Sequence, residues 1–425
     1  MTAAARQAAG ARGPATVLSV VLALALAIAL AATGRPATAA AATGPVVRAP
    51  AAILVEPATG DVVYQRNARD ERPIASTTKL MTALLTLERA RLGEKLTAVP
   101  YHPAPAESVI GLRAGERLTV ADLMRGLLLA SANDAAATLA ARIGGSRARF
   151  VRLMNRRARQ LGLHDTHYAN PIGLDEAGNH SSAEDLVKLT LILRRNRFFR
   201  AVTNLPSATL KTGARPRTIL NRNTLVREVP AVNGVKTGHT STAGYVLVGS
   251  ATRKGITVIS AVLGEPSEAA RDADSLTLLR YGLGRYHRVT AVKRGRAYAT
   301  AKLAHRNQRL ALVATRTVRR TVRRGEHLTT RIVGAPRQVE GPLPARARVG
   351  TIELRWRGRT VDRIALVTAR AVADATVVER AGGLIGRTLI VLAVAAVALG
   401  SLQVVLLRRR LQRRRRSRAG GTEIA

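Results

Sequence analysis

The chain contains no cysteine among its 425 residues. This absence excludes disulfide bonds, thiol catalysis and metal sites that use cysteine. Aromatic residues are also scarce, at 3% of the sequence, and 27 acidic residues face 68 lysines and arginines, which gives a formal net charge of +41. The shortage of negative charge favours polyanionic partners such as phosphate-bearing polymers or acidic lipid surfaces. Nucleic acid is not expected among them, because aromatic residues are few and no recognition motif is present.

An apolar segment follows two arginines at the start of the chain. Arg6 and Arg12 precede an uncharged run over residues 17–32, and small residues around Ala39 come next. This layout is typical of a secretory signal peptide, which we place at residues 1–40. An uncleaved anchor helix is the alternative for the same residues.

A second apolar segment lies near the other end of the chain. We place a transmembrane helix at residues 386–407, because the stretch from Thr388 to Leu407 is uncharged and has the length that crosses a bilayer, roughly 20 residues. A basic tail over residues 408–425 follows. Arginine beside a span stays in the cytoplasm, so we expect a single-pass protein of the cell membrane whose bulk is extracytoplasmic.

Residues 45–290 have strand patterns at both ends and helical patterns between them. Thr119 with Asp122, and Ser182 with Asp185, form starts that resemble capping boxes. If the terminal strands pair, they form one antiparallel sheet covered by helices, an α/β fold of the α+β kind. Strands are predicted at residues 51–55, 62–65, 245–250 and 256–263, and helices at residues 76–90, 119–129, 146–161, 182–195 and 268–284.

The character of the sequence changes over residues 296–373. Short β-type runs alternate there with glycine and proline turns, at residues 311–322, 327–333, 349–354 and 360–367. This pattern predicts a small β-rich domain between the α/β part and the C-terminal helix.

The motif Ser76-Thr77-Thr78-Lys79 opens a helical pattern after an extended segment. Ser76 and Lys79 are three residues apart, which places both side chains on one face of a helix. A serine hydroxyl is a weak nucleophile until a base takes its proton. Burial and a second cation nearby both lower the pKa of a lysine amine, so Lys79 is a candidate base for Ser76. Because so short a pattern also occurs by chance, it has weight only together with the motifs that follow it.

The motif Ser131-Ala132-Asn133 falls at a break in the helical pattern. A plain turn or an N-cap is the alternative interpretation, since serine and asparagine favour such positions. In a functional interpretation, Ser131 is a second hydroxyl that can pass a proton from Lys79 to a leaving amine. The Asn133 amide can then hold a substrate peptide group.

The tripeptide Lys-Thr-Gly occurs twice. The copy that begins at Lys211 is followed by Ala-Arg-Pro, a turn context, so we interpret it as a surface loop. The copy that begins at Lys236 runs into a strand pattern. A catalytic copy must lie on an edge strand that faces the nucleophile, with Gly238 leaving room for substrate. Only the second copy fits this requirement.

In this order, the three motifs of Ser76–Lys79, Ser131–Asn133 and Lys236–Gly238 resemble those of the low-molecular-weight penicillin-binding proteins, the serine-type D-alanyl-D-alanine carboxypeptidases of bacterial cell walls. The likeness covers about residues 51–288, and the β-rich segment resembles the small C-terminal domain of that family. The resemblance implies a penicillin-binding/β-lactamase-like transpeptidase fold. The matching stretches around the motifs include Asp134-Ala135-Ala136, Asn170-Pro171, Asn221-Arg222-Asn223 and Ala243-Gly244-Tyr245.

The resemblance also implies a role for each matching residue. Ser76 attacks the carbonyl between the two terminal D-alanines of a peptidoglycan stem pentapeptide and forms an acyl-ester, Lys79 is the general base, and Ser131 relays the proton. The backbone N–H groups of Ser76 and His239 form the oxyanion hole. β-lactams act as inhibitors, and neither a metal nor an organic cofactor is implied. Substrate-binding roles are implied for Asn133, Lys236, Thr237, His239, Arg271 and Arg222, although rim salt bridges are an equal alternative for the two arginines.

Two other functions and a metal site are the alternatives to this interpretation. A β-lactamase needs a separate carboxylate that activates the deacylating water, and no Glu-x-x-x-Asn stretch lies between Ser131 and Lys236. A non-catalytic wall-binding protein does not need reactive side chains, so their presence here argues against this alternative. The pair His164 and His167 lacks further ligands at metal spacing, so no metal is expected. One departure from the family is the C-terminal segment, which is long enough to cross a membrane rather than lie on its surface.

Overall fold

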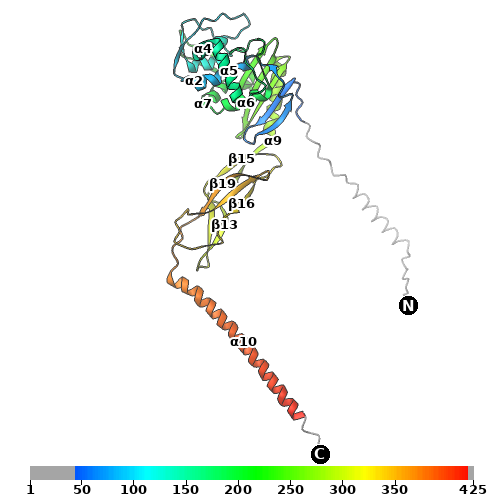
Figure 1. The fold of residues 1–425 in the computed structure, drawn as a ribbon, viewed down its shortest axis with the longest axis vertical. Helices are drawn as coiled ribbons and strands as arrows, with labels where there is room; N and C mark the ends of the chain where they lie inside the picture. The colour runs from blue at the N-terminus through cyan, green and yellow to red at the C-terminus, as the bar shows by residue number, and fades with distance from the viewer. Residues whose placement is uncertain (1–43, 420–425) are drawn as a thin grey trace, which may run out of the picture.

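The computed structural model describes residues 44–419. Three parts follow one another along the longest axis of the molecule: a part of mixed sheet and helices, a small β-rich part and a long C-terminal helix (Figure 1). The predicted signal peptide at residues 1–40 lies outside the described residues, and so does the end of the predicted basic tail from residue 420.

An antiparallel sheet of five strands organises the first part. Its spatial order is β2-β1-β11-β10-β9, so strands from the two ends of this part are neighbours. Ala51 of β1 pairs with Leu263 of β11, more than 200 residues away. This pairing confirms the predicted antiparallel sheet, and it leaves β9 at one edge. The five strands are β1 (Ala51–Glu56), β2 (Asp61–Arg66), β9 (Val232–Thr240), β10 (Gly244–Arg253) and β11 (Ile256–Glu265).

Helices cover both faces of this sheet. Alternate residues of a strand point to opposite faces, so Ile53 packs with the larger group of helices while Leu54 packs against α9. Because both faces are covered, the central strands have apolar residues at nearly every position. The helices are α2 (Lys79–Arg89), α3 (Val120–Leu128), α4 (Asn133–Gly144), α5 (Arg147–Gln160), α6 (Ala183–Leu193), α7 (Arg197–Thr203), α8 (Thr224–Glu228) and α9 (Glu268–Arg285), with a 3₁₀ turn, η1 (Ala75–Thr78), before α2.

Two of the helices begin at the caps that the sequence predicts. The Thr119 hydroxyl accepts a hydrogen bond of 3.2 Å from the Asp122 N–H at the start of α3. Ser182 does the same for Asp185 at the start of α6, at 3.1 Å. Three short strand pairs connect the helices at the periphery: β3 (Arg72–Pro73) with β6 (His180–Ser181), β4 (Lys95–Thr97) with β5 (Arg117–Thr119), and β7 (Ser207–Leu210) with β8 (Arg217–Leu220).

The β-rich part contains two further sheets. A six-stranded sheet has the order β16-β18-β19-β14-β13-β17, and β12 pairs separately with β15. The predicted run over residues 311–322 is two strands in different sheets, since the chain turns between them, and β12 begins inside the segment 45–290. The strands are β12 (Tyr286–Val292), β13 (Ala297–Leu303), β14 (Arg309–Ala314), β15 (Val318–Arg323), β16 (Thr329–Val333), β17 (Gln338–Val339), β18 (Arg348–Trp356) and β19 (Arg359–Thr368).

An ion-pair cluster joins the first two parts. Arg357, at the turn between β18 and β19, donates to both carboxylate oxygens of Asp61 on β2, at 2.6 and 2.9 Å. The Tyr286 hydroxyl donates to Asp61 at 2.8 Å, and Glu326 accepts from Arg357 at 2.7 Å. The guanidinium also lies 4.1 Å from the centre of the Trp356 ring. The β-rich part is therefore fixed to the N-terminal hairpin of the sheet.

The last element of the described residues is the long helix α10 (Val377–Ala419). Within the described residues, one stretch is long and apolar enough to cross a membrane, Thr388–Gln412. Its mean hydropathy is 2.6, and none of its residues is buried by the rest of the protein. Figure 1 shows that this helix packs against neither of the other parts along most of its length. A bidentate pair between Arg306 and Glu379 holds its first turn to the β-rich part, at 2.9 Å. The apolar helix is consistent with membrane anchoring.

Candidate active site

The candidate nucleophile lies on a tight turn rather than on the first turn of an α-helix. Ser76 is the second residue of η1, and α2 begins only at Lys79. The preceding Ala75 has φ +46°, a left-handed conformation that is uncommon for a residue with a side chain. The Thr77 side chain and backbone N–H both donate to the Ile74 carbonyl, which holds the turn closed. This conformation leaves the half-buried Ser76 side chain at the surface of a cleft.

Lys79 lies directly behind this serine. Its Nζ is 2.8 Å from Ser76 Oγ and also donates to the carbonyl of Ile172. The side chain is completely buried. The pKa of Lys79 is lowered to about 7, chiefly because desolvation disfavours the charged amine; Arg222 acts in the same direction, while Glu107 and Asp134 act in the opposite direction. A substantial fraction of this amine is therefore neutral near pH 7.

A second lysine and a second serine form a matching pair. Lys236 is the fifth residue of the edge strand β9, and its Nζ donates to Ser131 Oγ at 2.9 Å. Ser131 has φ +60° in the short connection between α3 and α4, which turns its hydroxyl toward the strand. Lys236 is buried, and desolvation first, then the charges of Lys79, Arg222 and Arg271, hold its pKa well below the usual range. Two buried amines that each contact a serine hydroxyl thus lie close to one another.

Asn133 is the first residue of α4 and lies two residues after Ser131 in the sequence. The side chain is 4% exposed. Its Nδ2 donates to Glu107 at 2.7 Å, and its Oδ1 is buried without a hydrogen-bond partner in the described part of the chain. A buried carbonyl oxygen without a donor is costly, so this atom is suited to accept from a bound ligand.

An aromatic and basic wall closes the other side of the cleft. The His239 ring stacks on Tyr245, with centroids 4.0 Å apart. The Arg271 guanidinium lies over the same tyrosine at 6.0 Å and pairs with Glu268 and Asp272. Arg271 itself is 3% exposed, so its guanidinium lies within the wall, while its partner Glu268 is exposed.

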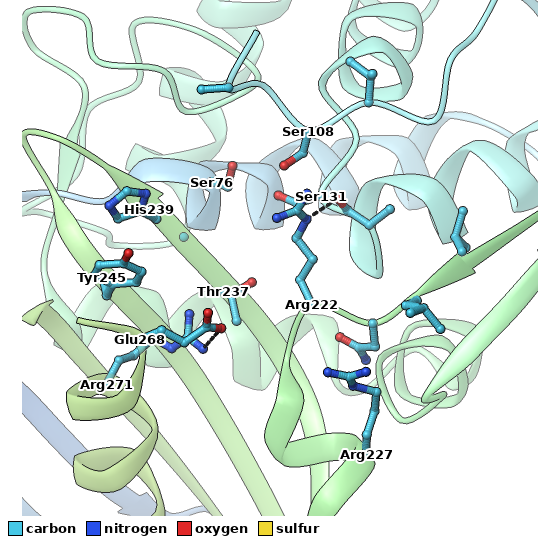
Figure 2. A pocket seen from close by; sticks show the side chains of 17 residues that line it. Ser76, Ser108, Ser131, Arg222, Arg227, Thr237, His239, Tyr245, Glu268 and Arg271 are labelled. Carbon is cyan, nitrogen blue, oxygen red and sulfur yellow. Dashed lines mark hydrogen bonds and ion pairs between the residues drawn. The ribbon is translucent and has the colours of Figure 1, made fainter.

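The remaining predicted residues lie around the same opening. Arg222 is exposed, donates to the Ala130 carbonyl at 3.2 Å and reaches over the cleft from one side, while Thr237 faces it from β9 (Figure 2). The cleft has a volume of about 580 Å³. Ser76, Ser131, Thr237, His239, Arg222 and Arg271 line it, and Lys79, Lys236 and Asn133 are buried behind these residues.

The rejected motifs lie elsewhere. Lys211 and Thr212 lie in the turn between β7 and β8, away from the cleft. Their N–H groups both donate to Asp122 of α3. His167 bonds to the Gly178 carbonyl at 2.7 Å and packs beside His180. Within residues 44–419 no group of three His, Asp or Glu side chains is arranged to hold a metal ion.

Sequence reasoning missed several residues in or next to the cleft. Glu107, which accepts from Asn133, and Tyr101, which donates to Glu107, come from the irregular connection between β4 and β5, where neither periodicity nor a motif marks them. Ser108 and Arg227 also line the cleft. The sequence marked Tyr245 only as part of the Ala243-Gly244-Tyr245 stretch. Its stacking on His239 had no signal in the sequence.

The sheet, its helices and a serine beside a buried lysine define a serine-type peptidase of the acyl-enzyme class. A family model described as D-alanyl-D-alanine carboxypeptidase matches residues 37–267. The chain belongs to this family, Peptidase S11, and it is a serine-type D-alanyl-D-alanine carboxypeptidase.

Curated relatives and solved structures agree with this assignment. The chain is 31% identical to D-alanyl-D-alanine carboxypeptidase DacD of Escherichia coli (strain K12), over 79% of this chain and 90% of the relative. It is 29% identical to DacF of Bacillus subtilis (strain 168), over 74% and 83%. Penicillin binding protein 5 from Haemophilus influenzae is similar in structure, with a TM-score of 0.56, 26% identity and coverage of 78% and 99%. The Streptomyces K15 DD-transpeptidase has a TM-score of 0.54, 35% identity and coverage of 57% and 99%.

Proposed function

We propose that Ser76 is the acyl-ester nucleophile of this carboxypeptidase and that Lys79 is the base that removes its proton. The contact of 2.8 Å between Lys79 Nζ and Ser76 Oγ carries the proposal. A general base must lie within hydrogen-bond reach of the proton it takes and have a pKa near the working pH. Lys79 satisfies both conditions, because burial brings its pKa to about 7.

In the acylation step, Ser76 Oγ attacks the carbonyl carbon of the scissile peptide bond. The tetrahedral oxyanion that forms is stabilised by the backbone N–H groups of Ser76 and His239. The proton taken by Lys79 reaches the departing D-alanine nitrogen through Ser131, whose hydroxyl is also 2.9 Å from Lys236 Nζ. The C–N bond breaks, D-alanine leaves, and a water molecule then hydrolyses the ester.

The cationic groups of the cleft bind the C-terminal carboxylate of the substrate. Lys236 and Thr237 lie on the strand beside the nucleophile, Arg271 forms the wall behind Tyr245, and Arg222 reaches over the opening. Asn133 accepts from a peptide N–H through its free Oδ1. The substrate is a stem peptide of peptidoglycan ending in D-Ala-D-Ala, and a β-lactam, which presents a carboxylate and a strained amide in similar positions, acylates Ser76.

The same proposal covers the organisation of the chain. Residues 1–40 form a secretory signal peptide, residues 45–290 the catalytic domain and residues 296–373 a β-rich spacer. The apolar part of α10 crosses the cell membrane once, and the arginines that follow it from Arg408 remain in the cytoplasm. The catalytic domain is then extracytoplasmic, where its substrate lies. Labelling of intact cells with a membrane-impermeant lysine reagent tests this topology, and protection of the catalytic domain in intact cells contradicts it.

Mass spectrometry of a synthetic pentapeptide ending in D-Ala-D-Ala tests the reaction. The full chain in detergent is expected to remove one alanine, and Ser76→Ala is expected to remove none while keeping its circular dichroism spectrum and melting temperature. Labelling by a fluorescent penicillin follows the same pattern. If Ser76→Ala still becomes labelled, the nucleophile is a different residue.

A further inference from the structure

Glu107 belongs to the irregular connection between β4 and β5, and this connection is held firmly against the start of α4. The Asn133 N–H donates to the Ser108 carbonyl at 2.7 Å. The Asp134 carboxylate accepts from the N–H groups of Ile110 and Leu112, the latter at 2.9 Å. The residue next to Ser108 therefore has a fixed position beside the cleft.

The Glu107 carboxylate accepts three hydrogen bonds. Its Oε2 accepts from Asn133 Nδ2 at 2.7 Å and from the Tyr101 hydroxyl, and its Oε1 accepts from the Ala104 N–H at 3.1 Å. Burial raises the pKa of this carboxyl, but the hydrogen bonds from Tyr101, Asn133 and Ala104 outweigh it, and the pKa is lowered. Glu107 is therefore ionised at neutral pH.

An ionised carboxylate only accepts hydrogen bonds, whereas an asparagine amide has one accepting and one donating end. Glu107 thus permits one orientation of Asn133, with Nδ2 toward the carboxylate. The opposite end, Oδ1, is then the buried atom without a partner. If the amide turned over, two oxygens would face each other and a donor would lie where a substrate N–H must bind.

Glu107 also contributes negative charge that acts on Lys79. The charged groups that act on Lys79 are Glu107 and Asp134, which favour its protonated form, and Arg222, which disfavours it. Lys236 is the second amine of the pair and is itself influenced by Lys79. Glu107 is the foremost of the groups that oppose the effect of burial on the base.

We propose that Glu107 is a positioning residue that holds the Asn133 amide with its oxygen free for substrate and supplies negative charge that acts on the buried base Lys79. This inference rests on the proposed roles of Lys79 and Asn133. The role differs from that of the carboxylate that activates water in a β-lactamase, because Glu107 acts through Asn133 and Lys79 and already accepts three hydrogen bonds.

Two substitutions separate the two parts of the proposal. Glu107→Gln keeps an oxygen that accepts from Asn133 but removes the charge. Glu107→Ala removes both. Tyr101→Phe removes a donor to Glu107 and leaves its charge in place, and Glu94→Gln is the matched control, since Glu94 is exposed and lies outside the cleft.

The charge is tested by NMR of the full chain carrying ¹³C-labelled lysine, which follows the Lys79 titration without any turnover. We expect the Lys79 titration to move to lower pH in Glu107→Gln, by about half a unit or more. The acid limb of kcat/KM for D-alanine release should move in the same direction. Tyr101→Phe and Glu94→Gln should leave the titration in place. A titration that is the same in Glu107→Gln and in the wild-type protein overturns the charge role.

The amide orientation is tested by steady-state kinetics at the pH optimum of each variant. We expect Glu107→Ala to lose about tenfold or more in kcat/KM, mainly through KM, because a hydrogen bond to a charged group is lost and Asn133 can turn. Glu107→Gln should recover most of this loss. A KM for Glu107→Ala equal to that of Glu94→Gln overturns the positioning role. If the wild-type protein releases no D-alanine, the proposed function fails, and the lysine titration still decides the charge role of Glu107.

Discussion

A Cβ atom at Gly238 would lie 3.1 Å from the backbone nitrogen of Ser76. It would also lie 3.0 Å from Ala75 Cβ and 3.1 Å from the Ile74 carbonyl oxygen. Strand β9 therefore approaches the nucleophile turn so closely that only a residue without a side chain fits without displacement. The backbone of the edge strand and the backbone of the turn form the two sides of the proposed oxyanion hole.

Gly238→Ala should push β9 away from Ser76 and displace one oxyanion donor. We expect the rate of acylation by a fluorescent penicillin to fall by about 10²-fold or more, the usual effect of losing such a donor. Gly284→Ala is the control, because a Cβ at Gly284 has no atom within 4 Å. Equal acylation rates in the two variants would contradict the close-approach argument.

The two Lys-Thr-Gly copies provide a matched pair of substitutions. Lys236→Ala removes the amine that contacts Ser131 and should reduce acylation by about 10²-fold or more. Its stability should not fall in proportion, since a buried amine with a lowered pKa contributes little to folding. Lys211→Ala, on an exposed turn, should acylate at the wild-type rate. Stopped-flow measurements with penicillin compare them, and loss of activity in the Lys211 variant would show that the wrong copy has been assigned.

The ion pair between Arg357 and Asp61 should decide how firmly the β-rich part is held. Arg357 is the largest cause of the lowered pKa of Asp61. In Arg357→Ala we expect the β-rich part to melt separately, at a slightly lower temperature, because a partly exposed pair is worth about 1 kcal/mol or less. Hydrolysis of a short pentapeptide should not change. Calorimetry of the full chain compares this variant with Arg359→Ala, which changes an exposed neighbour. If both variants unfold in a single transition, the ion pair does not couple the β-rich part to the rest of the protein.

Glu265 should make the protein less stable as the pH rises. It is buried at the end of β11 with one oxygen unpartnered, and burial, then the neighbouring Asp274 carboxyl, raise its pKa to about 7. Between its unfolded pKa of about 4.3 and pH 7, the folded protein holds a proton that the unfolded chain has lost, so the free energy of unfolding falls with pH in this window.

Glu265→Gln keeps a donor toward Asp274 and cannot ionise. We expect this variant to be more stable than the wild-type protein at pH 8, by about 1 to 2 kcal/mol, and nearly equal to it at pH 5. Urea unfolding at the two pH values measures the difference. The same difference at both values would mean that ionisation of Glu265 has no part in it.

The elements that follow a local rule were predictable from the sequence. The caps at Thr119 and Ser182, the hairpin of β10 and β11 and the antiparallel sheet all follow from residue type and period, and the structure contains them. The three motifs that resemble the family also lie around one cleft. Their order along the chain was enough to predict the fold, because the family has one fold.

Features set by tertiary packing could not be predicted. The positive φ values of Ala75 and Ser131 are imposed by neighbouring segments and have no local signal. Glu107 lies in a connection without periodicity, and its partner Asn133 is 26 residues away. The burial of Arg271 depends on Tyr245 from another element. β12 and β13 contain few large aliphatic residues and several alanines, threonines and charged or polar residues, so their strand pattern is weak.

The position of β9 at the end of the five-stranded sheet has a consequence for selectivity. Its outer row of amides and carbonyls is a template onto which another extended chain can add as a further strand. A peptide bound in this way is held mainly through its main chain, which is the same whatever side chains it carries. If a substrate peptide adds to this edge, chemical variation in its side chains upstream of the cleaved bond is tolerated, because the sheet contacts only the main chain.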